Sequence, residues 1–554
     1  MVRKESLVPA AITVSGQVTG TPGNDDYQGS TGNDTMLMQQ GGDDTLFGDD
    51  GSDGFYFGAA FNALDKVDGG AGIDTLALQG PYSGSTTNLS QVSNTEVVLL
   101  LSGSDTRFGD NANNRYSYNL TSIDGNVAAG QILTLQATGL LPGENIVFDG
   151  SAESDGGFRI YPGQGVDVLK GGAGSDGFFF GADHNLSGRD QIDGGAGVDS
   201  IALRGNYVGT GRVVFTDSSF AHIEVLAILS SHTNEYGGTV SPDGFDYDIV
   251  TADGNVAAGQ RLDVIAARLG SDESLIFDGS AELDGTFRVI SGAGNDTIHG
   301  SQGNDVLFGG AGFDFLYAEN GSDYLDGGAG GDVLYFGANL DSNDSANGGA
   351  DVDQLWIGGR DYTDADFSGV TGMESVAIIT AGNSYVFADK AQQAGIMSIG
   401  DVSSGANIID ATAYHDYLVL GISGGAGGDL LAGGSGYENL YIYNHRTDSY
   451  GNFKDQIYGF VSGFDVIDAT FMSGETNGAF QMNFVGNFSS EFSAELALPF
   501  NFGKLNAAFV TSTHTLWFDL NNDRQFDDHD LSIILVGVNS LRPEDVKHGA
   551  FVIG

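Results

Sequence analysis

The most regular pattern of apolar and polar positions lies between Gly292 and Phe336. Five consecutive nine-residue units each place an Asp two residues after a Gly, and an aliphatic residue two residues after that Asp. The aliphatic residues are Ile298, Leu307, Leu316, Leu325 and Leu334. A helix repeats its apolar positions every three or four residues, so a period of nine indicates short strands that alternate with Gly-rich turns. The single apolar residue of each unit is predicted to face inward.

These units resemble the GGxGxDxUx nonapeptide of RTX calcium-binding proteins. The resemblance implies a parallel β-roll, in which two units form one turn and Asp residues eighteen positions apart share a calcium ion. Asp296 would then pair with Asp314, Asp305 with Asp323, and Asp314 with Asp332. An Asp can alternatively cap its own turn through the backbone. Five stacked carboxylates repel one another without a cation, however, and this repulsion favours bound metal.

Shorter runs of Gly and Asp with similar spacing occur in three other places, which gives four repeat blocks. In the first block one residue is inserted near Gln39 and Gln40, and in the fourth Glu438 stands where the spacing predicts Asp. The predicted calcium ligands of the four blocks are Asp25, Asp34, Asp44, Asp53, Asp167, Asp176, Asp296, Asp305, Asp314, Asp323, Asp332 and Asp429.

Part of the chain is duplicated at an offset of 129 residues. The segment DGNVAAGQ begins at Asp124 and again at Asp253, and FDGSAE begins at Phe148 and again at Phe277. Between the blocks, runs of Val, Leu, Ile and Thr bounded by Asn, Ser and Gly predict strands. The predicted fold is all-β, with parallel β-roll (RTX) blocks that alternate with β-rich domains in a modular repeat architecture.

The predicted segments are nine in number and follow the change in composition along the chain. They are a lead-in at 1–19, RTX block 1 at 20–57, β-rich domain 1 at 58–160, RTX block 2 at 161–181, β-rich domain 2 at 182–290, RTX block 3 at 291–337, β-rich domain 3 at 338–420, RTX block 4 at 421–440, and a β-rich C-terminal cap and type I secretion region at 441–554.

Charge and composition narrow the class of ligand. The 554 residues include 74 acidic and 21 basic side chains, which gives a net charge of −53, and only 15 of the acidic residues are Glu. An excess of Asp in Gly-rich turns suits several Ca²⁺ ions, which take six to eight oxygen ligands from carboxylates and backbone carbonyls. The charge argues against nucleic acid, whose phosphates require Lys and Arg. Without Cys the chain has no disulfide, and without a run of eighteen apolar residues no membrane span is expected.

A different acidic loop lies near the C-terminus, between Asp519 and Asp530. It places oxygen side chains at EF-hand-like positions, although Arg524 stands where an EF-hand has Gly and strand-like sequences flank it on both sides. The candidate ligands in this loop are Asp519, Asn521, Asp523, Asp527 and Asp530. With the downstream GVNSLRPEDVKHGAFVIG it also resembles the terminal hairpin of type I secretion substrates, and the two interpretations are compatible.

These patterns predict a secreted calcium-binding structural protein of the bacterial cell surface that folds and assembles on binding calcium. The resemblance extends to surface-layer proteins that carry RTX repeats, which implies self-association into a sheet or lattice, with cell-surface polysaccharide as a further partner. The N-terminus lacks the apolar stretch of a cleaved signal peptide, so export would use another route. The resemblance to RTX proteins implies that this route is type I secretion. We expect that the chain is not an enzyme. GISGG at 421–425 has the G-x-S-x-G spacing of a catalytic serine motif, but it lacks the strand-to-helix turn of that motif. A calcium-dependent adhesin is the main alternative, and a secreted hydrolase with a cryptic site is a weaker one.

Overall fold

The computed structural model describes residues 12–108, 114–181, 186–233, 240–415, 420–434, 438–443, 446–449, 453–469, 481–499, 504–521, 523–527 and 529–547. The ends of the predicted lead-in and of the predicted secretion region, 1–11 and 548–554, lie outside these residues. The chain divides into two compact units, Met1–Gly303 and Asn304–Gly554.

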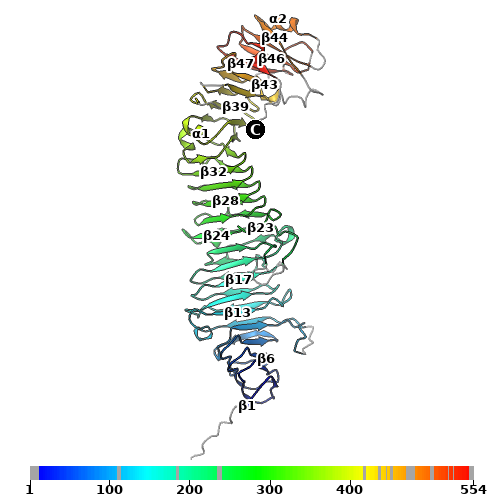
Figure 1. Cartoon of the computed structure of the whole chain (residues 1–554), viewed down its shortest axis with the longest axis vertical. Helices are drawn as coiled ribbons and strands as arrows, with labels where there is room; N and C mark the ends of the chain where they lie inside the picture. Colours follow the sequence, from blue (N-terminus) through cyan, green and yellow to red (C-terminus); the bar gives the residue numbers. More distant parts are fainter. Residues whose placement is uncertain are drawn as a thin grey trace, which may run out of the picture. The chain divides into compact units, whose positions relative to one another are not determined.

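In the first unit the strands alternate between two sides of a stack of coils, so that each strand pairs in parallel with strands of the preceding and following coils (Figure 1). One side consists of β2 (Gln17–Thr19), β4 (Thr35–Leu37), β6 (Gly54–Gly58), β8 (Thr75–Leu78), β11 (Val97–Leu100), β13 (Ile132–Gln136), β15 (Gly157–Tyr161), β17 (Gly177–Phe180), β19 (Ser200–Leu203), β22 (Val225–Ile228), β24 (Arg261–Ile265) and β26 (Thr286–Ile290).

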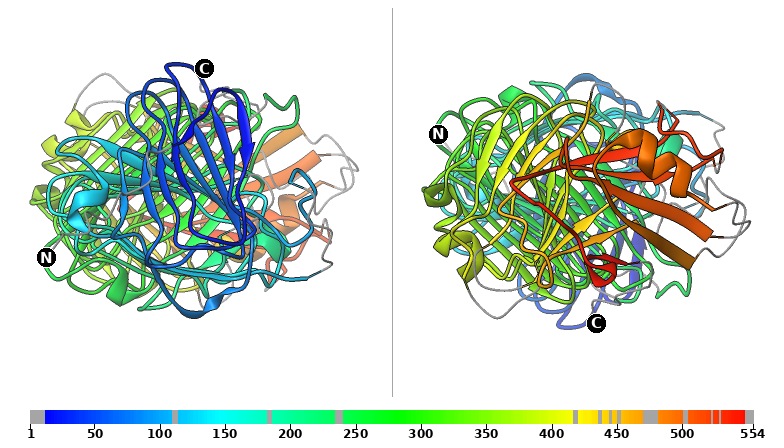
Figure 2. Two further views of the ribbon diagram at one scale, coloured as in Figure 1. Left: turned by 90° about the horizontal axis from the view of Figure 1, so that it is seen from below. Right: turned by 90° about the horizontal axis from the view of Figure 1, so that it is seen from above.

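The other side of the first unit consists of strands from three parallel sheets. Figure 2 shows the coils of this unit along the stack, with the first coils in dark blue nearest the viewer on the left. The first sheet has β1 (Ile12–Thr13), β3 (Asp26–Gln28), β5 (Thr45–Phe47), β7 (Lys66–Asp68) and β10 (Val92–Ser93); the second has β9 (Tyr82–Asn88), β12 (Tyr118–Thr121), β14 (Ile146–Asp149), β16 (Val168–Lys170), β18 (Gln191–Asp193) and β21 (Phe220–Ala221); the third has β20 (Val213–Val214), β23 (Tyr247–Val250), β25 (Leu275–Asp278) and β27 (Thr297–His299). The 3₁₀ turns η1 (Asp124–Asn126), η2 (Gly209–Gly211) and η4 (Asp253–Asn255) lie in the corners.

The second unit continues the same alternation in its own strands. One side has β28 (Val306–Ala311), β30 (Tyr324–Ala329), β32 (Ser345–Ala350) and β34 (Val370–Thr371); the other has β29 (Phe315–Tyr317), β31 (Val333–Gly337), β33 (Gln354–Ile357), β35 (Ser375–Ile378), β37 (Ser398–Asp401), β39 (Leu420–Ser423), β41 (Asn439–Ile442), β43 (Val466–Asp468) and β48 (Val546–Lys547).

A further sheet of the second unit is mixed: two pairs among its C-terminal strands are antiparallel, and the other pairs are parallel (Figure 2, right, orange to red). Its strands in spatial order are β36 (Ser384–Val386), β38 (Ile408–Asp410), β40 (Leu430–Ala432), β42 (Gln456–Tyr458), β47 (Leu531–Val536), β46 (Thr515–Asp519), β45 (Lys504–Val510) and β44 (Gln481–Phe488). The helices and 3₁₀ turns of this unit are α1 (Asp389–Gln393), α2 (Glu491–Ala497), η5 (Asp364–Phe367), η6 (Arg446–Asp448) and η8 (Pro543–Asp545). No helix among the described residues is both long and apolar enough to cross a membrane.

The apolar core consists of ladders of side chains stacked in register from coil to coil. Leu316 of β29 pairs with Leu334 of β31, which pairs with Leu355 of β33, and all three are fully buried. The remaining aliphatic residues of the five-unit pattern, Ile298, Leu307 and Leu325, are also fully buried. The prediction of a parallel β-roll with one inward apolar residue per nonapeptide is confirmed.

The strands between the repeat blocks pair in parallel with the strands of those blocks. In the region predicted as β-rich domain 1, β8 pairs with β6 of the first block on one side and with β11 on the other. The same holds for β33 in the region predicted as β-rich domain 3, which pairs with β31 and β35. Longer corners change the composition of these regions while their strands add coils to the stack of the same unit.

Candidate metal sites

Stacked carboxylates line the corners of the second unit, which contains four of the five Asp residues of the strict five-unit pattern. The backbone N–H of Asp305 donates to Oδ1 of Asp323 at 2.8 Å, and that of Asp314 donates to Oδ1 of Asp332 at 2.9 Å. Asp residues eighteen positions apart therefore lie in adjacent coils, on top of one another. All four are at most 3% exposed.

The carboxylates of Asp332 and of Asp53, the latter in the first unit, each lie beside a glycine and a backbone carbonyl oxygen of the next coil. A Cβ built on Gly327 would lie 2.5 Å from Oδ2 of Asp332 and 2.6 Å from the carbonyl oxygen of Gly348. On Gly48 it would lie 2.4 Å from Oδ2 of Asp53 and 2.2 Å from the carbonyl oxygen of Gly69. Glycine therefore leaves a space lined by carboxylate and carbonyl oxygens, the donors that Ca²⁺ prefers.

The carboxylate oxygens that face these spaces lack hydrogen-bond donors. Oδ2 of Asp53 and Oδ2 of Asp332 are buried and accept no hydrogen bond from the protein, although a buried carboxylate oxygen is normally satisfied. The same holds for Oδ2 of Asp74, Asp167, Asp199, Asp353, Asp429 and Asp455. The residues therefore fit calcium: Asp carboxylates and Gly carbonyls would hold the ion, which would supply the missing positive charge.

Burial and mutual repulsion raise the pKa of the stacked carboxyls. Burial, followed by the charges of Asp305 and Asp344, raises the pKa of Asp323 to about 8. Burial, followed by the charge of Asp353, raises the pKa of Asp332 to about 7. These carboxylates are costly in the charged form unless a cation compensates them.

In the first block the structure brings together the four predicted ligands in two stacks and adds two Asp residues that were not predicted. The N–H of Asp25 donates to Asp44, whose own N–H donates to Asp65. At the other corner Asp34 donates to Asp53, whose N–H donates to Asp74. The stacks continue past the predicted end of the block at Phe57.

The second block likewise acquires neighbours that the repeat pattern did not predict. The N–H of Asp167 donates to Oδ1 of Asp190 at 2.8 Å, and that of Asp176 donates to Oδ1 of Asp199 at 2.7 Å. Asp296 of the third block, which also lies in the first unit, accepts a hydrogen bond from the N–H of Leu275. Burial, and then Asp190, raises the pKa of Asp167 to about 7.

Each of three stacks ends at a glutamate. Glu96 accepts the N–H of Asp74, Glu224 that of Asp199, and Glu374 that of Asp353. Residues two positions earlier, Asn94, His222 and Gly372, all adopt positive φ angles of 47°, 53° and 62°. The Glu that precedes each apolar run thus marks the end of a carboxylate stack, a role that the sequence pattern alone did not reveal.

The stacked Asp residues that were not predicted differ in how clearly the sequence indicates them. Asp74 and Asp199 follow GGAGI and GGAGV, which match the nonapeptide, but they lie 21 and 23 residues from their partners instead of 18. Asp65 and Asp344 lack a Gly two residues earlier, and Asp190 follows Gly188 but none of the other glycines of the nonapeptide. The Oδ2 atoms of all three accept an N–H from three residues earlier in the chain. Only the stacking of coils identifies these three.

The fourth block contains one predicted ligand and corrects a detail of the register. The N–H of Asn407 donates to Asp429, and the N–H of Asp429 donates to Oδ1 of Asp455 at 2.9 Å. In the other stack the N–H of Asn439 donates to Asp465, so Asn439, and not Glu438, occupies the position where the repeat expects Asp. Asn439 lies ten residues after Asp429 instead of nine, so one inserted residue between them explains the shift.

The acidic loop at 519–530 joins the antiparallel strands β46 and β47, in agreement with the strands predicted on both sides. Asp519 accepts the N–H groups of Asp523 and Arg524, and Asp530 accepts those of Leu520 and Asp527. The ring of His529 contacts Asp527, and the side-chain amide of Asn521 donates to Asp523. Burial, followed by hydrogen bonds that oppose it and then the charges of Asp519 and Asp527, raises the pKa of Asp530 to about 7.

Arg524 adopts φ of +69°, the left-handed conformation for which an EF-hand uses Gly at this position. The backbone therefore turns as a cation-binding loop requires despite the Arg. Calcium binding by the five candidate ligands of this loop, like calcium binding by each individual Asp of the four blocks, stays a prediction.

The fold and its corners define a class of protein, a parallel β-roll with stacks of buried carboxylates. A family model described as the RTX calcium-binding nonapeptide repeat (4 copies) matches residues 19–37, 40–64, 160–186, 186–204, 288–316 and 299–334. The chain is thus a protein with RTX repeats, which bind calcium and are typical of secreted proteins. A search among curated proteins found no match.

Proposed function

We propose that this protein is a structural component of the bacterial cell surface, a surface-layer or extracellular matrix protein that folds and self-associates when it binds calcium outside the cell. The observation that supports this most is the series of buried carboxylate stacks in both units, whose free oxygens face Gly carbonyls. We also propose that the chain is not an enzyme.

Calcium would control where the chain folds. Inside the cell, where free calcium is scarce, repulsion within the stacks would keep the chain unfolded and suitable for type I secretion. Outside, each site that binds only the folded state adds RT ln(1 + [Ca²⁺]/Kd), or roughly 1.4 kcal/mol at ten times Kd. Several such sites make folding steeply dependent on calcium.

Three exposed apolar residues at equivalent positions support self-association. Ile73, Val198 and Val352 each precede the last Asp of a carboxylate stack, and their side chains are 63%, 60% and 63% exposed. Exposed apolar side chains at these equivalent corners are available for contacts with another molecule. A second copy of the chain presents the same three side chains.

Two measurements test the proposal. Circular dichroism and thermal melting with and without a chelator should show loss of the fold without calcium, and an unchanged melting temperature would contradict calcium-dependent folding. Electron microscopy after calcium addition should show ordered sheets, which Ile73→Ser/Val198→Ser/Val352→Ser should weaken. A protein that stays monomeric at high concentration in calcium would overturn the surface-layer role and favour an adhesin.

A further inference from the structure

Two clusters of carboxylates lie outside the nonapeptide turns. In the first, one oxygen from each of Asp124, Glu153 and Asp155 lies within 4.8 Å of the others. The second has the same arrangement at Asp253, Glu282 and Asp284, exactly the residues offset by 129 in the duplicated sequence. Neither cluster contains a residue that the repeat pattern singled out.

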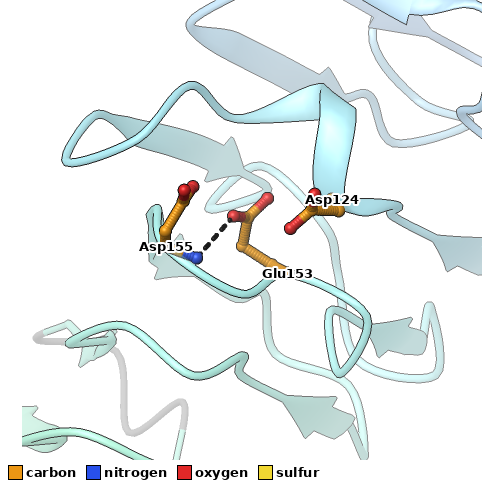
Figure 3. Close-up of side chains that lie close together, drawn as sticks. All are labelled: Asp124, Glu153 and Asp155. Carbon is orange, nitrogen blue, oxygen red and sulfur yellow. Dashed lines mark hydrogen bonds between the residues drawn. The ribbon is translucent and has the colours of Figure 1, made fainter.

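The stacking of two corners forms each cluster. Asp124 begins η1, between β12 and β13, whereas Glu153 and Asp155 lie between β14 and β15 in the next coil. Because β12 pairs with β14 and β13 with β15, the two corners lie against each other. In Figure 3 the carboxylate of Glu153 lies between the side chains of Asp124 and Asp155.

Asn126 holds the η1 corner in place. Its amide nitrogen donates to the carbonyl oxygens of Leu89 and Val92, both at 2.7 Å, and its Oδ1 accepts the N–H of Ile123 at 2.7 Å. In the second copy Asn255 donates to the carbonyl of Thr216 and accepts the N–H of Ala252 in the same way. Asp124 and Asp253 are therefore presented by fixed turns.

The buried glutamate supplies the observation that separates these clusters from ordinary acidic surface. Oε1 of Glu153 accepts the N–H groups of Ser154, Asp155 and Gly156, at 3.1, 3.2 and 2.8 Å. Oε2 is buried and accepts no hydrogen bond, and the side chain is 1% exposed. Oε2 of Glu282 is likewise buried and accepts no hydrogen bond, and the Glu282 side chain is fully buried.

The hydrogen bonds that cap the turn account for Oε1 of each glutamate. They do not account for the buried Oε2. A Gln would cap the same N–H groups with its single carbonyl oxygen, without placing a second charged oxygen in a buried position. Three carboxylates so close together repel one another, and no ion pair among the described residues compensates these six. The exposure of Asp124 and Asp155 leaves room for water to complete a coordination shell.

We propose that each cluster binds one divalent cation, with Ca²⁺ as the ion that suits an all-oxygen site of mixed carboxylate and water ligands. Glu153 and Glu282 are the buried ligands, and the four Asp residues are the exposed ones. The sites lie one coil before a nonapeptide turn: the N–H of Ala173, in the turn that contains Asp176, donates to the carbonyl oxygen of Glu153 at 2.9 Å. Each bound ion thus links the corner that contains η1 or η4 to the corner of the next coil, which contains the glutamate.

The two copies differ in the hydrogen bonds that their first Asp accepts. Oδ1 of Asp124 accepts hydrogen bonds from both the N–H and the hydroxyl of Ser154, whereas Oδ1 of Asp253 accepts only the N–H of Leu283. The hydroxyl of Ser154 competes with a cation for Asp124. The cluster at Glu282 therefore binds calcium more tightly than the cluster at Glu153.

The test measures bound calcium on the full-length protein. In equilibrium dialysis with radioactive calcium, Glu153→Gln/Glu282→Gln should bind two fewer ions per chain than the unmodified protein. Gln keeps the backbone hydrogen bonds of the turn, so circular dichroism in calcium should be unchanged. The matched control, Glu491→Gln/Glu544→Gln, makes the same change of charge at exposed glutamates and should lose no ion.

An unchanged number of bound ions in Glu153→Gln/Glu282→Gln would overturn the proposal, as would an equal loss in the control. If that variant does not fold, Asp155→Asn/Asp284→Asn provides the test, because these exposed side chains leave the capping by the glutamates intact. It should lose the same two ions or bind them at least tenfold more weakly, and unchanged affinity would overturn the proposal. Loss of these two sites with calcium-dependent folding retained would separate them from the nonapeptide sites.

Discussion

The backbone N–H of Asp332 donates to Oδ1 of Asp353, 2.7 Å away in the next coil. Asp332 belongs to the regular nonapeptide series, whereas Asp353 lies 21 residues further along, beyond its end. The carboxylate stack therefore extends beyond the last nonapeptide. Residues outside the repeat, such as Asp353, add carboxylates to the same stack.

The first prediction concerns Asp353→Asn. Asn still accepts the N–H of Asp332 but removes a negative charge from the stack, so it weakens calcium binding and also relieves repulsion in the calcium-free protein. We expect the calcium concentration at half-folding to rise about tenfold, equivalent to roughly 1.4 kcal/mol. At the same time the calcium-free variant should retain more folded structure, measured by circular dichroism, than the calcium-free unmodified protein. Asp243→Asn, at an exposed position, should change neither quantity; a similar shift in both variants would contradict a specific role for Asp353.

The second prediction uses two glycines of the first block. In Gly48→Ala the new Cβ would meet Oδ2 of Asp53 and the carbonyl oxygen of Gly69, which fills the space for the ion. In Gly54→Ala nothing lies within 4 Å of the new Cβ. Calcium titrations followed by circular dichroism should show a weaker response, by at least about tenfold in midpoint, in Gly48→Ala alone. Equal titration curves for the two variants would rule out a calcium site beside Gly48.

The third prediction concerns pH in the absence of calcium. The pKa values of Asp167, Asp199 and Asp332 are raised to about 7 and that of Asp323 to about 8, whereas an unfolded Asp titrates near 3.9. The folded state thus binds more protons between about pH 4 and pH 8, and stability must fall as the pH rises through this window.

Calcium-free protein should accordingly retain more folded structure, measured by circular dichroism, at pH 5 than at pH 8. Calcium replaces the protons as the compensating charge, so saturating calcium should reduce or reverse this difference, and calcium affinity should increase from pH 5 to pH 8. As a control for the overall net charge, Asp167→Asn/Asp323→Asn should show a smaller dependence on pH than a variant with two exposed Asp residues replaced. Greater stability of the calcium-free protein at pH 8 would contradict the prediction.

The fourth prediction concerns the apolar ladder at saturating calcium. Leu316→Ala removes a fully buried side chain that stacks on Leu334, and should lower the free energy of unfolding by about 2–5 kcal/mol. Val352→Ala, at a position 63% exposed, should change it by less than about 0.5 kcal/mol. Denaturant unfolding monitored by circular dichroism measures both. A small effect of Leu316→Ala would mean that calcium, and not the core, supplies nearly all of the stability.

The sequence by itself determined the β-roll, the inward position of Leu316 and its equivalents, and the pairing of Asp305 with Asp323. The inward position of Leu316 follows from the local period of nine, whereas the β-roll and the pairing of Asp305 with Asp323 follow from the resemblance of that period to the RTX nonapeptide. The duplication at 129 residues was also visible, although it did not show what Glu153 and Glu282 do.

The tertiary structure alone decided which carboxylates face one another once the coils become unequal in length. Asp344, Asp353, Asp455 and the terminal Glu374 join the stacks at separations of 21 to 26 residues, which depend on loops with no constant spacing. Likewise, Asp124 meets Glu153 only because two corners 29 residues apart in the chain are stacked by parallel strand pairing. Local repetition reveals equal coils, whereas contacts between unequal coils arise only when hydrogen bonding between strands brings them into register.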